Sequence, residues 1–119
     1  MLRSGIGLVI AAVMVAPIAS VEEKLEKQKI EALLKHIDEL KDAKFIRNGT
    51  EHDAKAAAKY LRIKWERSDS QVKTARDFIE KVATTSSTSG KPYLIRLKDG
   101  KDQNLGEYLT AELKKIEKP

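Results

Sequence analysis

Apolar residues are unevenly spread along the chain, and their spacing predicts which segments have separate roles. Residues 5–19, GIGLVIAAVMVAPIA, form an uncharged apolar stretch that follows Met-Leu-Arg and precedes a charged segment. A short basic start, an apolar stretch of about 10–15 residues and a small-residue exit are typical of a secretory signal peptide. The stretch is shorter than the roughly 20 residues of a membrane-spanning helix. We therefore predict a signal peptide over residues 1–20, cleaved after Ala16, Ala19 or Ser20. The alternatives are an uncleaved membrane anchor and a buried N-terminal helix.

Four segments beyond residue 20 carry apolar residues at helical spacing, and each is predicted to form an amphipathic helix. The first runs from Val21 to about Asp42 without Gly or Pro, and we expect it to pack from Leu25 or Ile30 onward. Each of the other three is expected to begin at a polar N-cap residue. A second polar residue three positions later can complete a capping box with it. These pairs are Thr50 with Asp53, Thr74 with Asp77, and Asn104 with Glu107.

Two short segments, Phe45-Ile46 and Tyr93 to Leu97, combine β-branched and aromatic residues and are predicted to form strands. Asn48-Gly49 and Asp99-Gly100 follow them as turn signals. An unpaired strand leaves its backbone groups unsatisfied, so we expect the two strands to pair, in the commoner antiparallel sense. The predicted fold is an α+β domain over residues 21–119. In it, about four helices pack on a short two-stranded antiparallel ribbon in the order α-β-α-α-β-α.

The composition excludes several classes of protein. Of the 119 residues, 41% are hydrophobic, which is enough for a packed core. None is cysteine, which rules out disulfides, thiolate metal sites and a cysteine nucleophile. The two histidines have no clustered carboxylates, so we expect neither a metal nor another cofactor. The formal net charge is +5, and removal of residues 1–20 leaves 99 residues at +4. Because export is predicted, we expect a periplasmic monomer that does not bind nucleic acid and has no stable membrane span after cleavage.

Several blocks of the chain resemble one known family. They are residues 45–49 (FIRNG), the alanine-rich residues 54–61, residues 74–79 and residues 86–93 (SSTSGKPY). In order and spacing they are similar to the YfeK-like proteins, which are small secreted proteins of Gram-negative bacteria with unknown function. The resemblance extends over roughly Ile30 to Ile116, with one departure at Asp53, where some members carry a cysteine. It implies a periplasmic location and a common fold, and it supplies no activity.

The hydroxyl-rich loop is the most prominent chemical feature. Ser86, Ser87 and Ser89 lie just before Lys91, but the residue three positions before Lys91 is Thr88, so the Ser-x-x-Lys pattern fails. The loop does not match a phosphate-binding P-loop either. We expect a structural or ligand-contacting loop. The alternative is a small hydrolase in which a serine of this loop is activated by His52.

Two candidate binding surfaces follow. The first comprises Arg47, Asn48, His52, Ser86, Ser87, Ser89, Lys91 and Tyr93. Within it, we favour an internal salt bridge for Arg47 over contact with an anionic ligand. The second is the basic stripe Lys55, Lys59 and Arg62, whose spacing places them on one side of a helix. It serves solubility or, as the alternative, binds anionic envelope lipid or an acidic partner.

These observations lead to one functional expectation. We expect an exported, non-enzymatic binding or interaction module of the cell envelope, whose partner is an envelope protein or an anionic ligand. The serine hydrolase and the lipid-binding surface remain the alternatives. A nucleic-acid-binding protein is a third class, which the predicted export disfavours.

Overall fold

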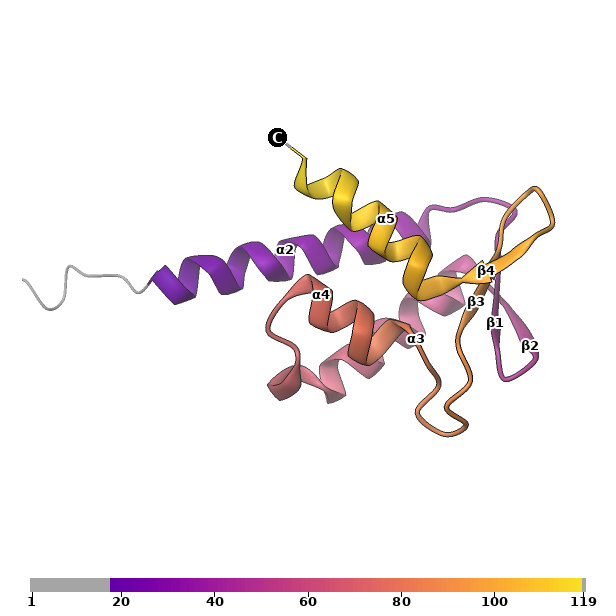
Figure 1. Cartoon of the computed structure of the whole chain (residues 1–119), viewed down its shortest axis with the longest axis horizontal. Coiled ribbons are helices and arrows are strands. Elements are labelled where there is room, and N and C mark those ends of the chain that lie inside the picture. The colour runs from indigo at the N-terminus through magenta and orange to yellow at the C-terminus, as the bar shows by residue number, and fades with distance from the viewer. Residues whose placement is uncertain (1–17, 119) are drawn as a thin grey trace, which may run out of the picture.

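The structure, a computed structural model, describes residues 18–118 (Figure 1). Residues 1–17, which make up most of the predicted signal peptide, lie outside the described residues. The helical elements are α2 (Ile18–Asp38), α3 (Ala54–Arg67), the 3-10 turn η1 (Asp69–Gln71), α4 (Ala75–Phe78), its π-helical continuation η2 (Ile79–Ala83) and α5 (Leu105–Glu117). The strands are β1 (Lys44–Arg47), β2 (Thr50–Asp53), β3 (Leu94–Arg96) and β4 (Asp102–Asn104). The expected α+β class is confirmed.

The sheet has four strands in the order β2-β1-β3-β4, with every neighbouring pair antiparallel. The two predicted strands pair as expected, with Phe45 opposite Ile95. The expectation of a two-stranded ribbon is wrong, because the chain turns back after each predicted strand and forms a second strand beside it. Each of the added strands, β2 and β4, lies at an edge of the sheet.

The turn at Asn48-Gly49 explains the first added strand. Both residues have positive φ, 52° and 80°. A two-residue turn with positive φ at both positions matches the twist of a β-hairpin and folds the chain straight back. Thr50 therefore begins β2 instead of the predicted helix. The helix cap moves to Asp53, whose Oδ1 accepts a hydrogen bond from the N–H of Ala56 at 2.8 Å.

The core lies between the helices and one face of the sheet (Figure 1). Helix α2 contributes Ile30, Leu33, Leu34 and Ile37, each at most 2% exposed. Its N-terminal part projects beyond the other elements, and Val21 and Leu25 are about half exposed. The apolar packing of helix α2 therefore begins at Ile30. No helix within residues 18–118 combines the length and apolar character needed to cross a membrane.

The remaining predicted caps have different outcomes. Thr74 and Asp77 form the predicted capping box at the start of α4, with both hydrogen bonds present. Asn104 stands at the N-cap position of α5, but its amide donates to the Glu107 carboxylate at 3.1 Å instead of its side chain accepting from the backbone. The start of α5 also lies unusually close to the end of η2. A Cβ atom at Gly106 would be 2.8 Å from Oγ1 of Thr84.

Candidate functional site

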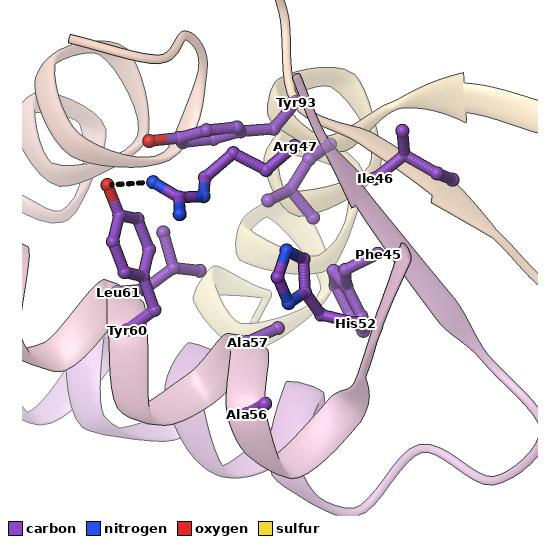
Figure 2. A pocket seen from close by; sticks show the side chains of 10 residues that line it. Phe45, Ile46, Arg47, His52, Ala56, Ala57, Tyr60, Leu61 and Tyr93 are labelled. Atoms are coloured by element: carbon purple, nitrogen blue, oxygen red, sulfur yellow. Dashed lines mark hydrogen bonds between the residues drawn. The ribbon is translucent and has the colours of Figure 1, made fainter. Parts of the chain in front are cut away.

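A pocket of about 90 Å³ lies between the inner face of the sheet and α3 (Figure 2). Strands β1 and β2 supply one wall and the first two turns of α3 supply another. Most of the lining is apolar, and four polar side chains interrupt it. The lining residues are Phe45, Ile46, Arg47, His52, Ala56, Ala57, Tyr60, Leu61, Tyr93 and Leu105. Such an apolar pocket with a few polar groups is the usual form of a small-molecule site.

Arg47 is the cation of the pocket. Its guanidinium stacks on the ring of Tyr60, with Cζ 4.4 Å from the ring centroid, and Nη1 donates to the Tyr60 hydroxyl at 3.1 Å. Figure 2 shows the guanidinium between the rings of Tyr60 and Tyr93. Those rings meet edge to face, with centroids 6.3 Å apart. Within residues 18–118, Arg47 forms no ion pair with a carboxylate, so the favoured expectation of an internal salt bridge is wrong.

Lys64 is a second cation in contact with Tyr93. Its ammonium donates to the Tyr93 hydroxyl at 3.0 Å and to the backbone carbonyl of Thr85 at 2.8 Å. Lys64 comes one helical turn after Tyr60 on α3, so both reach the same region. No ion pair involves Lys64 in the part of the chain that the structure describes. Two cations and two phenols therefore gather here without a balancing carboxylate.

The proton affinities of these groups reflect that arrangement. The Tyr93 hydroxyl lowers the pKa of Tyr60, and the positive charges of Arg47 and Lys64 add to the effect against the opposing influence of burial. Burial, followed by the interaction with Tyr60, raises the pKa of Tyr93. Burial also lowers the pKa of Lys64, since it disfavours the charged ammonium. An anion entering this region would relieve the excess of positive charge.

His52 is the fourth polar side chain of the pocket. It lies on β2 opposite Phe45 and projects between the sheet and α3 (Figure 2). Its Nε2 is buried and has no hydrogen-bond partner within the described residues. Buried polar side-chain atoms nearly always have a partner, so this nitrogen is an exception, and a ligand that reached it would supply the missing hydrogen bond.

The hydroxyl loop is bound to the β1–β2 turn. Nδ2 of Asn48 donates to Oγ of Ser86 at 3.3 Å, and Oγ of Ser89 donates to Oδ1 of Asn48. Ser86 is only 2% exposed and also hydrogen-bonds to Thr88 at 3.0 Å. These contacts support the structural interpretation of the loop. No hydrogen bond joins His52 to a serine of this loop in the described structure, so the geometry gives the hydrolase alternative no support.

The candidate residues thus divide into two groups. Arg47, His52 and Tyr93 meet at the pocket, whereas Asn48, Ser86 and Ser89 form the adjoining contact between the turn and the loop. The side chains of Ser87 and Lys91 are exposed and do not line the pocket.

The basic stripe is partly neutralised by α2. Arg62 forms a bidentate ion pair with Glu31, with hydrogen bonds of 2.9 and 2.5 Å, and Lys55 lies 3.6 Å from Asp38. Two of the three stripe residues therefore bridge α2 and α3. This arrangement weakens the case for a surface that binds anionic lipid.

Sequence reasoning missed two residues of the site, Tyr60 and Lys64. They are spaced i, i+4 on α3 and flank its apolar stripe, so their proximity to each other was detectable. Their proximity to Arg47 and Tyr93 depends on how the sheet packs against α3. Among residues 18–118, no group of three or more His, Cys, Asp or Glu side chains is arranged to hold a metal ion.

The fold and the pocket define a class: a small α+β protein with an apolar, arginine-containing pocket between sheet and helix. A family model, described as a family of unknown function (DUF5329), matches residues 24–117, and the chain belongs to this family. The chain is also 36% identical over 85 residues to the uncharacterized protein YfeK of Salmonella typhimurium (strain LT2), an alignment that covers 71% of each chain. The resemblance to YfeK-like proteins is thereby confirmed. No solved structure matches the chain significantly.

Proposed function

We propose that this protein is an exported, non-enzymatic binding module of the bacterial cell envelope, and that its pocket binds a small anionic ligand. The observation that carries the proposal is the environment of Arg47. Its guanidinium is oriented by Tyr60, borders an apolar pocket and has no carboxylate partner within the described residues. An arginine held in this way is suited to bind an anionic group of an incoming molecule.

The export part of the proposal rests on residues 1–20. Cleavage after Ala19 or Ser20 would fall in the first turn of α2, well before Ile30, the first buried residue of that helix. Because the N-terminal part of α2 makes little contact with the core, cleavage would leave the core intact. Cleavage after Ala16 would lie outside the described residues.

N-terminal sequencing tests the location. The full-length precursor is expressed in a Gram-negative host, and the periplasmic fraction is collected. We expect a new N-terminus after Ala16, Ala19 or Ser20. Recovery of the chain with Met1 attached, in the cytoplasm or the membrane fraction, would overturn the proposed export.

Nuclear magnetic resonance tests the binding role. The cleaved protein is titrated with a small set of simple anions, cations and neutral molecules, and we expect anions to shift the signals of Ala57 and His52. No shift with any compound would overturn the proposed pocket function. Covalent labelling of Ser86, Ser87 or Ser89 by a fluorophosphonate probe would overturn the non-enzymatic role in favour of the hydrolase.

A further inference from the structure

We propose that the ligand of this pocket is a small aliphatic monocarboxylate, either a free acid or the carboxyl terminus of a peptide. This inference rests on the proposed function and specifies the chemistry of the ligand. Three properties of the pocket lead to it: the single cation, the small apolar volume and the unpaired His52 nitrogen.

Charge favours a monoanion. Arg47 is the one cation among the residues that line the pocket, and Lys64, which donates to the Tyr93 hydroxyl, is not among them. A guanidinium has five N–H donors, and the described structure engages one of them, on Nη1, with the Tyr60 hydroxyl. The remaining donors suit the two oxygens of a carboxylate, which binds arginine through paired hydrogen bonds. A second negative charge on the ligand would face a lining that holds no further cation.

Volume and lining favour an aliphatic body of few carbon atoms. The pocket of about 90 Å³ is smaller than the roughly 150 Å³ cavity that accommodates benzene, which favours a compact ligand over a bulky one. Apolar walls from Phe45, Ala57, Leu61 and Leu105 surround the remaining space. Inorganic phosphate has no apolar part and would leave these walls without a complementary surface. A propionate-sized molecule matches both features.

His52 supplies a second polar contact. Figure 2 shows its ring facing the same space as the Arg47 guanidinium. In the tautomer with hydrogen on Nε2, the buried nitrogen donates to an oxygen of the bound carboxylate. This contact would give the unpaired Nε2 its missing partner.

The test compares propionate with propionamide, a neutral molecule of nearly the same shape. Both are titrated into the cleaved protein, in a buffer without other carboxylates or phosphate, while the signals of Ala57 and His52 are followed. We expect propionate to bind at least tenfold more tightly than propionamide. We also expect Arg47→Met to weaken propionate binding at least tenfold. Lys98→Met removes one positive charge from the exposed turn between β3 and β4, and this control should change the affinity less than twofold.

Two kinds of failure are distinguishable. Equal affinities for propionate and propionamide, or tighter binding of phosphate, would overturn the ligand class while leaving the pocket as a binding site. The absence of any shift with propionate, propionamide, propylamine and phosphate would overturn the proposed function as well. Both comparisons use the unsubstituted protein, so they hold even if Arg47→Met fails to fold.

A further titration with a dipeptide identifies the source of the carboxylate. Alanylalanine is compared with its C-terminal amide and with propionate. Tighter binding of the dipeptide than of propionate, lost in the amide, supports a peptide terminus as the ligand. Tighter binding of propionate supports a free acid. Amide and dipeptide binding with equal affinity would overturn recognition of a terminal carboxylate.

Discussion

The amide of Asn48 connects the β1–β2 turn to Ser86, with Nδ2 donating to Oγ over 3.3 Å. Oδ1 of the same side chain accepts a hydrogen bond from Ser89, so both ends of the amide are used. Arg47 directly precedes Asn48, and Tyr93 follows the loop that contains the two serines. The contact therefore fixes the two segments that carry Arg47 and Tyr93 relative to each other.

Two substitutions of Asn48 distinguish the stability contributed by its side-chain hydrogen bonds from the stability contributed by its tolerance of positive φ. Asn48→Gly tolerates the positive φ of 52° but loses both hydrogen bonds, and we expect a loss of about 1 kcal/mol in unfolding free energy. Asn48→Ala loses the same bonds and must also hold a left-handed backbone, which costs roughly 1–2 kcal/mol more. In urea denaturation, the unfolding free energy should therefore be highest for the wild type, lower for Asn48→Gly and lowest for Asn48→Ala. An alanine variant as stable as the glycine variant would contradict this assignment.

Gly106 should respond unusually to substitution. In most helices, replacing Gly by Ala gains about 1 kcal/mol. Here the new Cβ would be 2.8 Å from Oγ1 of Thr84, so we expect Gly106→Ala to destabilise the protein by about 1–3 kcal/mol. In a Thr84→Ala background the close contact is gone, and the same substitution should be neutral or stabilising. Additive effects in this double-mutant cycle would show that the two residues do not interact.

The core depends strongly on Phe78. The ring is fully buried and packs edge to face on Trp65, with centroids 5.9 Å apart. Phe78→Ala should reduce the unfolding free energy by about 3–5 kcal/mol. The single tryptophan provides a fluorescence signal for this measurement. Leu25→Ala, at a position 51% exposed, is the control and should change stability by no more than about 0.5 kcal/mol. Similar losses in the two variants would contradict the described packing.

Three carboxylates couple stability to acid pH. The Arg62 guanidinium lowers the pKa of Glu31. Burial opposes ionisation of Glu26, but the N–H of Ala75 and the Lys29 ammonium outweigh it, so the pKa of Glu26 is also lowered. For Asp77, the main cause of the lowered pKa is the hydrogen bond from the Lys73 N–H.

The sign of the pH effect follows from these directions. Each folded-state pKa is below its unfolded value, so the unfolded chain binds more protons in acid. The stabilisation is fully present above the ordinary carboxyl pKa values of 3.8 to 4.5 and is lost as the pH falls through the lowered values. Urea denaturation between pH 6 and pH 2.5 should reveal this decline. Asp77→Asn should make the decline shallower, and an unchanged slope would remove Asp77 from the explanation.

The predicted elements are correct where burial produces a periodic pattern. The apolar residues of α2, α3 and α5 recur at helical spacing because one face of each helix packs into the core. Phe45 and Ile95 mark the central strands for the same reason. The capping box at Thr74 was also predictable, since it depends on residues that are close in sequence.

The missed strands lack such a pattern. Strand β2 is Thr-Glu-His-Asp and β4 is Asp-Gln-Asn, and apart from half-buried His52 their residues are exposed. As edge strands they are held by backbone hydrogen bonds to a neighbour, with little side-chain burial to select apolar residues. The turns Asn48-Gly49 and Asp99-Gly100 were the available signals, because each is a strong marker of a β-hairpin.

The sequence by itself determined the α+β class, the positions of the amphipathic helices, the two central strands and the absence of cysteine chemistry. These features depend on local periodicity, turn residues and composition. Only the tertiary structure decided that Arg47 stacks on Tyr60 instead of pairing with a carboxylate, and that Tyr93 and His52 share its pocket. Arg47 lies on β1, Tyr60 on α3 and Tyr93 just before β3, and their contacts arise from how the sheet packs on α3. No local pattern encodes such a long-range contact, because each residue's own neighbours in the sequence are compatible with several packings.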